Sequence, residues 1–169
     1  MNEEQILRFR EQKDAFFKRH SDSPLTTDQR QAFDGLRYFE YNADLVYTLV
    51  PEPVEGEETI QIMTTTNEIR NYRRYGRITF HVDDTDASLT IYETPHGYFL
   101  PFVDNSDETY GAGRYLDLEP EPDGAFKIDF NLAYNPYCVY NENYSCPLTP
   151  LENRLTVPIN AGEKVPEIE

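Results

Sequence analysis

The N-terminal part of the chain has hydrophobic residues at helical spacing. Residues 3–19 carry one apolar stripe, with charged side chains outside it. The stripe consists of Ile6, Phe9, Phe16 and Phe17. Thr27 is a suitable cap for a second, short helix through Phe33, and Gly35 is a suitable stop for it. We therefore expect residues 1–35 to form a helical extension.

From Tyr38 onward, hydrophobic residues alternate with polar ones, which is the pattern of strands with one buried face. Short turns that contain Gly, Pro or Asp separate these segments. The alternating positions are Ile60 and Ile62; Ile78, Phe80 and Val82; Leu89 and Ile91; Leu116 and Leu118; and Phe126, Ile128 and Phe130. The pattern predicts a mostly β fold, a small antiparallel barrel or a barrel-like sandwich. The N-terminal helices would pack against the sheet or fill one open end.

One segment interrupts this alternation. Residues 131–153 are polar and rich in proline, yet they carry four tyrosines. A long segment of this kind in a compact domain is usually functional, or is held down by its own side chains. We interpret residues 1–169 as one domain, with a helical extension at 1–35 and a β domain at 36–169. Residues 131–153 would form a long ordered loop of that domain.

The chain is strongly acidic. Its 169 residues include 31 Asp and Glu against 15 Lys and Arg, which gives a formal net charge of -16. This sign argues against binding to nucleic acids or to anionic lipids, because both require neutralisation of phosphates. Among the basic residues, Arg outnumbers Lys by 11 to 4. Excess acid with little lysine fits the salt-rich cytoplasm of a halophile, and an ordinary acidic protein is the alternative.

The sequence contains no apolar run of the length that crosses a membrane. Its first residues are charged and lack the hydrophobic region of a secretory signal. We therefore expect a cytoplasmic protein that is not embedded in a membrane. The oligomeric state does not follow from the sequence.

Arg114 is the first candidate for chemistry. Strand alternation places it on the same face as Leu116 and Leu118, which is the expected core face. A buried guanidinium keeps its charge, so it needs a carboxylate or a ligand anion. A structural ion pair and an anion-binding site both satisfy this need. Glu152 and Asp104 lie in irregular segments that are free to reach Arg114, and we favour Glu152 as the partner.

Asp129 and Asn131 face away from the core if Phe130 faces inward. They would lie on a polar face of the sheet, or cap the following turn by accepting backbone N–H groups. Asp129 and Glu152 are also the candidate catalytic carboxylates. Two carboxylates in different environments can divide the work of acid and base.

A basic cluster consists of Arg70, Arg73, Arg74 and Arg77. Alternation divides the cluster between the two faces of a strand, with Arg70 and Arg74 opposite Arg73. In so acidic a chain we expect these arginines to pair with neighbouring carboxylates. Stacking on nucleic-acid bases is the alternative.

Cys138 and Cys146 are the two cysteines, and seven residues separate them. In a reducing compartment they would be a pair of thiols, and in an oxidising one they would form a disulfide across the loop. Their spacing is longer than in common zinc sites, and the three histidines lie in distant contexts. We therefore expect no metal and no cofactor.

Several segments carry a family resemblance. They are FREQKDAFF at 9–17, FDGLRYF at 33–39, TYGAGRYLDL at 109–118 and DFNLAYNPYCVYNENYSCPLTPLENRLTVPINAGEK at 129–164. In these motifs the chain resembles a bacterial and archaeal family known as domain of unknown function 1684. The resemblance covers nearly the whole chain, and it implies a single domain without implying an activity.

These observations lead to a functional hypothesis. We expect a soluble β-barrel domain that binds a small polar or anionic ligand, because an Arg in an apolar setting suits such a ligand. The expected ligand-binding residues are Arg114, Asn131, Tyr134, Asn135, Tyr137, Asn153 and Arg154. One alternative is an enzyme that uses Asp129 or Glu152 as a general base beside Arg114. A second is an interaction module that binds through the tyrosine-rich loop.

Overall fold

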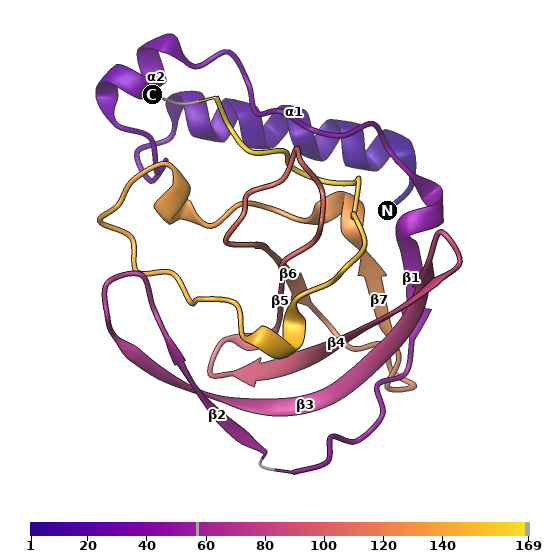
Figure 1. Cartoon of the computed structure of the whole chain (residues 1–169). Coiled ribbons are helices and arrows are strands. Elements are labelled where there is room, and N and C mark those ends of the chain that lie inside the picture. The colour runs from indigo at the N-terminus through magenta and orange to yellow at the C-terminus, as the bar shows by residue number, and fades with distance from the viewer. Residues whose placement is uncertain (57, 168–169) are drawn as a thin grey trace.

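The computed structural model describes residues 1–56 and 58–167, and Figure 1 shows strands that curve beneath an N-terminal helix. The helices are α1 (Glu3–Arg19) and α2 (Thr27–Ala32), with 3-10 turns at Ala43–Leu45, Phe130–Leu132, Tyr137–Val139 and Leu151–Asn153. The strands are β1 (Val46–Leu49), β2 (Thr59–Met63), β3 (Ile69–Val82), β4 (Thr85–Thr94), β5 (Gly97–Phe102), β6 (Arg114–Leu118) and β7 (Phe126–Asp129). The expected mostly β class is confirmed.

Both predicted helices form, and each begins with a reciprocal cap. The side chain of Asn2 accepts a hydrogen bond from the Gln5 N–H at 2.9 Å, and the Gln5 side chain accepts one from the Asn2 N–H at 2.9 Å. The cap of α2 lies one residue earlier than predicted. Thr26, rather than Thr27, accepts from the Gln29 N–H at 3.2 Å. A capping box needs Glu or Gln three residues after the cap, and Gln29 meets this requirement only for Thr26.

The strands form two antiparallel sheets. The larger has the order β2-β3-β4-β5-β6, and β1 pairs with β7 in a separate two-stranded sheet. Single bridges link the two sheets, between Glu52 and Arg77 and between Pro120 and Phe126. The described strands therefore do not close into the barrel that we considered from the sequence. One bridged pair on each side is too short to continue a hydrogen-bonded ladder around the molecule.

One hydrophobic core lies between the inner faces of the sheets. The strand alternation is confirmed there, since the predicted inward positions at 78–82, 89–91, 116–118 and 126–130 are all buried in this core. Ile62 is buried in a second cluster on the other face of the larger sheet, which we call the outer face. That cluster consists of Ile62, Tyr72, Tyr92, Phe99 and Tyr115, with Ile60 and Tyr134 packed against it.

A β-bulge changes the faces of the arginines in β3. The pairing of β3 with β4 shifts between Arg74 and Gly76, so Arg74 lies opposite Tyr92 and Arg77 lies opposite Thr90. Arg77 therefore shares the outer face with Arg74, which simple alternation does not predict. Gly76 is required at this point, because a Cβ atom there would lie 2.6 Å from the Cβ of Pro51.

Loop 131–153 runs between α1 and the outer face of the larger sheet. The ring of Phe17 in α1 lies 5.9 Å from that of Tyr137 and 5.2 Å from that of Tyr140, centre to centre. On the sheet side, Tyr134 forms a bridge with Tyr115. Figure 1 shows α1 across one end of the curved sheets. The loop is therefore ordered because both of its sides are packed.

Candidate functional site

Arg114 is fully buried and bonded to the protein itself. Its guanidinium donates to the backbone carbonyls of Ile159 at 2.8 Å and Glu163 at 3.1 Å, and also to that of Ala161. Its carboxylate neighbour is Asp104, at 3.6 Å between Nη2 and Oδ1. Burial lowers the pKa of Arg114, and the Asp104 charge opposes that shift. Arg114 therefore fastens the C-terminal segment to β6, and its ion partner is not the Glu152 that we favoured.

Glu152 instead pairs with Arg74 across the outer face. The Arg74 Nε donates to the two carboxylate oxygens at 3.0 and 3.3 Å, and the Tyr92 hydroxyl also donates to Glu152. Arg73 pairs with Glu93 at 2.9 Å. The expectation that this basic cluster pairs with nearby acids is confirmed for these two arginines. The predicted pairing of Glu152 with Arg114 was wrong, because the loop carries Glu152 to β3 rather than to β6.

Asp129 and Asn131 are buried rather than turned toward solvent. One Asp129 oxygen accepts from the backbone N–H of Asn131 at 3.0 Å and from its side-chain amide at 2.9 Å. The Asn131 side chain also accepts from the Asn42 N–H at 2.9 Å and donates to the Asn42 carbonyl at 3.0 Å. The predicted turn cap is therefore confirmed, whereas the outward orientation was wrong. The 3-10 turn that starts at Phe130 carries the chain inward directly after β7.

The other two predicted asparagines also bond to backbone groups. The Asn135 amide donates to the Lys164 carbonyl at 2.9 Å. Asn153 accepts from the Thr90 N–H at 2.8 Å and donates to the carbonyls of Thr90 and Pro101 at 2.9 and 2.8 Å. Both asparagines are buried, and neither borders one of the hollows described next. Their amides stabilise the loop.

A hollow with a volume of about 990 Å³ lies at one end of the outer face. We call it the tyrosine hollow. It is lined by Tyr72, Thr94, His96, Gly97, Tyr98, Phe99, Tyr115, Asp117, Leu118, Glu119, Pro120, Lys127, Tyr134 and Pro147. Of the predicted ligand-binding residues, only Tyr134 is among them. The hollow is therefore built by the sheet, with the loop as one wall.

Aromatic rings and one carboxylate characterise this hollow. The ring of Tyr115 lies 4.7 Å from that of Phe99 and 5.8 Å from that of Tyr134, both edge-on. The Tyr134 hydroxyl donates to Asp117 at 2.7 Å. Burial, and secondarily the Asp117 charge, raises the pKa of Tyr134, which keeps this hydroxyl protonated. Tyr115 and Asp117 alternate with Leu116 and Leu118, so strand alternation was the signal that placed them on one face.

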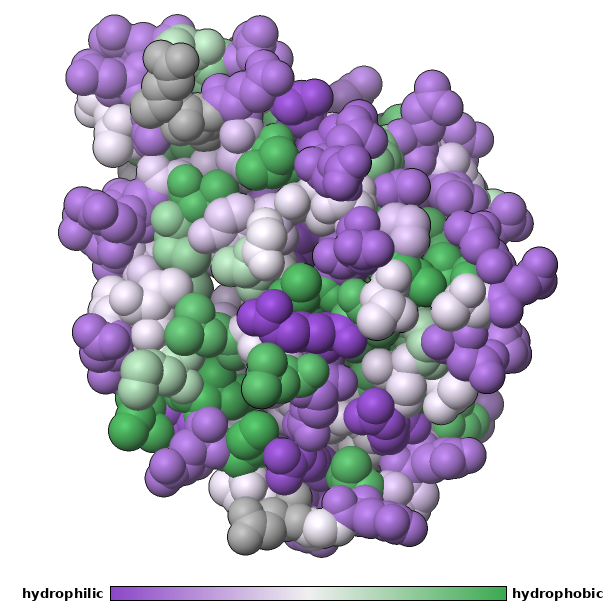
Figure 2. All heavy atoms as spheres, in the orientation of Figure 1, coloured by the Kyte–Doolittle hydropathy of each residue, from purple (hydrophilic) through white to green (hydrophobic). Residues whose placement is uncertain are grey.

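Two smaller hollows flank the pair of Arg74 and Glu152, with volumes of about 430 and 480 Å³. Next to the first, hydrophobic side chains reach the surface, which Figure 2 shows as green spheres at the lower left. The exposed hydrophobic residues of the β2–β3 hairpin and of loop 131–153 are Met63, Ile69, Leu148 and Leu151. The carboxylate of Glu152, which borders both hollows, already accepts hydrogen bonds from Arg74 and Tyr92.

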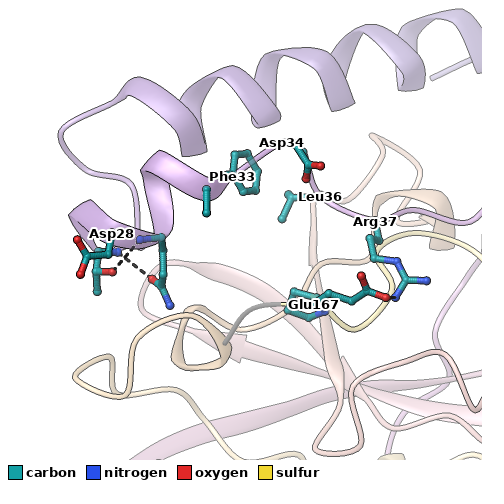
Figure 3. Close-up of a pocket in the computed structure, with 11 residues that line it drawn as sticks. Asp28, Phe33, Asp34, Leu36, Arg37 and Glu167 are labelled. Atoms are coloured by element: carbon teal, nitrogen blue, oxygen red, sulfur yellow. Dashed lines mark hydrogen bonds and ion pairs between the residues drawn. The ribbon is translucent and has the colours of Figure 1, made fainter.

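A further hollow of about 680 Å³ lies beside α2 (Figure 3). Asp28, Asp34, Arg37 and Glu167 border it, and Arg37 and Glu167 form an ion pair at 3.1 Å. The side chains of that pair are 43% and 80% exposed, so solvent weakens their interaction. None of the predicted site residues lines this hollow.

Tyr137 and Arg154 complete the predicted set. Tyr137 packs between α1 and the ring of Tyr144, which lies 5.3 Å away. Arg154 is exposed and lines none of the hollows described above. Tyr137, Tyr140 and Tyr144 thus pack on Phe17 or on one another, and Tyr134 packs on Tyr115. All four tyrosines are buried or half-buried, so they do not form the flat exposed patch that an interaction module would use.

Cys138 and Cys146 lie together as free thiols. The Cys138 N–H donates to the Cys146 sulfur at 3.3 Å. Hydrogen bonding from Cys138 lowers the pKa of Cys146 to about 6, whereas the pKa of Cys138 is raised. Over the described residues, no group of three or more His, Cys, Asp or Glu side chains is placed to hold a metal ion. None of the described helices is both long and apolar enough to cross a bilayer.

Comparisons with known proteins give a family and a fold. The family model described as "Protein of unknown function (DUF1684)" matches residues 31–164. The chain is similar to the solution NMR structure of an uncharacterized protein of Haloarcula marismortui, with 33% identity over 96% of this chain and 93% of that one, and a TM-score of 0.69. No curated protein matches. The high-salt interpretation of the charge stays a prediction, as does the cytoplasmic location.

Proposed function

The chain belongs to the DUF1684 family, and we propose that it binds a small polar ligand, neutral or cationic, in the tyrosine hollow. The observation that carries this proposal is the hydrogen bond from Tyr134 to Asp117 beside the exposed parts of the aromatic cluster. Sites for small molecules combine apolar walls with a few polar groups that fix the orientation of the ligand. This hollow has both.

The polar groups retain capacity for a ligand. Asp117 is exposed and accepts from Tyr134 through one oxygen. A carboxylate accepts several hydrogen bonds, and a phenol that donates one can still accept another. A ligand with hydroxyl or ammonium donors would therefore bond to Asp117 and Tyr134, while its apolar side packs on Phe99 and Tyr115.

Charge favours this ligand class over an anion. Asp117 and Glu119 line the hollow against one lysine, Lys127. The anionic ligand considered from the sequence depended on Arg114, whose guanidinium is committed to carbonyls and Asp104. An anion in the tyrosine hollow would meet two carboxylates, which repel it.

Titration of labelled protein with choline, glucose and sulfate tests this proposal. Choline represents the cationic class, glucose the neutral class and sulfate the anionic one. We expect choline or glucose to shift the amide NMR signals of residues that line the tyrosine hollow, and sulfate to leave them in place. If neither choline nor glucose moves those signals at millimolar concentration, the proposal is wrong.

Asp117→Asn is expected to weaken the binding of the active probe about tenfold, because a hydrogen bond to a charged group is lost. The dissociation constant from the same titration measures this change. Glu142→Gln is the matched control, since Glu142 is an exposed acid of the loop that does not line the hollow. An equal effect of both variants would show that net charge alone matters.

A further inference from the structure

Cys138 and Cys146 form a second candidate site, separate from the tyrosine hollow. The loop brings the two cysteines together, although seven residues lie between them. The Cys138 backbone N–H donates to the Cys146 sulfur at 3.3 Å. The Cys146 sulfur therefore lies against the backbone of Cys138, and a rotation of the Cys138 side chain would bring the two sulfur atoms to bonding distance.

The position of Cys146 is fixed by the turn after β2. Its N–H donates to the Thr65 hydroxyl oxygen at 3.1 Å, and its carbonyl accepts from the Thr65 N–H at 3.0 Å. Arg70 on β3 donates to the carbonyl of Ser145 at 3.1 Å, which places a positive charge near the Cys146 sulfur. Cys138 lies on the 3-10 turn at Tyr137–Val139.

The surroundings favour a thiolate at Cys146. The hydrogen bond from the Cys138 thiol and the charge of Arg70 lower its pKa, while burial opposes them. Tyr110 and Tyr115 also face the pair, and burial raises the pKa of both. Both phenols are therefore neutral at pH 7 and add no negative charge that would disfavour the thiolate.

We propose that Cys138 and Cys146 are a redox-active dithiol that small peroxides oxidise to a disulfide. The Cys146 thiolate attacks one oxygen of hydrogen peroxide, the O–O bond breaks, and the departing hydroxide takes up a proton to become water. The sulfenic acid that results is attacked by the Cys138 sulfur. The S–S bond forms, the S–O bond breaks, and a second water leaves with the Cys138 proton. The dithiol loses two electrons and the peroxide gains them.

The limited exposure of the two cysteines restricts the oxidant to a small molecule. Cys146 is only 7% exposed and Cys138 is half-buried. Hydrogen peroxide is small enough to reach such a thiolate, whereas attack on a bulky disulfide would require its sulfur to enter the loop.

The test is thiol counting in the full-length protein, before and after treatment with hydrogen peroxide. We expect peroxide to remove both alkylatable thiols and to lower the intact mass by two hydrogen atoms. A peptide that links Cys138 to Cys146 should appear, and dithiothreitol should restore both thiols. If both thiols survive an excess of peroxide, or if sulfinic acid forms without a disulfide, the proposal is wrong.

Two variants assign the roles of the cysteines. Cys138→Ala should let dimedone trap a sulfenic acid on Cys146 after peroxide treatment. Cys146→Ala should leave Cys138 no more reactive than free cysteine. In the wild type, alkylation by iodoacetamide should fall as the pH drops through about 6, and Cys138→Ala should shift this midpoint upward. Faster peroxide oxidation at Cys138 than at Cys146 would contradict the assignment.

Discussion

Arg114→Leu is expected to lower the free energy of unfolding by about 3–5 kcal/mol, because it leaves a buried carboxylate without its counterion. Leucine matches the alternation of β6 and keeps apolar packing at this position. The carboxylate of Asp104 is 2% exposed and would lose Arg114, although Thr109 and the Ile159 N–H still donate to it. Three backbone carbonyls would also lose the Arg114 donor, and of these the Ile159 carbonyl still accepts from the Ala161 N–H.

Urea denaturation of the variant and the wild type, in the same high-KCl buffer, measures this change. Arg154→Leu is the matched control, because Arg154 is exposed and its replacement should change stability by less than about 0.5 kcal/mol. Unchanged or increased stability of Arg114→Leu would contradict the structural role. Arg114 would then not stabilise the fold, and it would again be a candidate ligand-binding residue.

Arg114 also illustrates what a strand pattern can and cannot predict. Alternation with Leu116 and Leu118 predicted its burial, because the face of a side chain depends only on its position along one strand. Its partner depends on where two irregular segments lie in space, which no local period encodes. Asp104 reaches Arg114, while Glu152 lies against β3.

The predicted ligand-binding asparagines show a second limit. Asn131, Asn135 and Asn153 are the residue types that ligand sites use, and they occur in a proline-rich loop. Such a loop has few ladder partners for its backbone, so buried side-chain amides must satisfy the N–H and C=O groups around it. In the sequence, these asparagines therefore fit either ligand binding or hydrogen bonding to the backbone. In the structure, all three bond to backbone groups.

The tyrosine hollow was only partly predictable. Tyr134 was identified from the density of motifs in the loop, whereas Tyr115 and Asp117 were not singled out. Their alternation with two buried leucines places both on the outer face, and this signal was present in the sequence. The contact between Tyr134 and Asp117 could not be predicted, because it depends on the path that the loop takes across that face.

Asn153→Ala is the second large effect, with an expected loss of about 3 kcal/mol in the free energy of unfolding. The ladder between β4 and β5 covers only Tyr92–Thr94 and Gly97–Phe99. Pro101 has no N–H, so it cannot donate to β4. Beyond the ladder, the amide of Asn153 joins the strands through its bonds to Thr90 and to the Pro101 carbonyl. Alanine would leave these buried groups without partners.

Thermal and urea denaturation measure the loss, and hydrogen exchange locates it. The amide proton of Thr90 should lose protection in Asn153→Ala, because its acceptor is the deleted side chain. Asn143→Ala is the matched control, since Asn143 is an exposed residue of the same loop. A ligand-binding role predicts the opposite result, in which Asn153→Ala keeps its stability and loses affinity for the probe. A structural role of Asn153 therefore predicts a loss of stability in Asn153→Ala, whereas a ligand-binding role predicts a loss of affinity at unchanged stability.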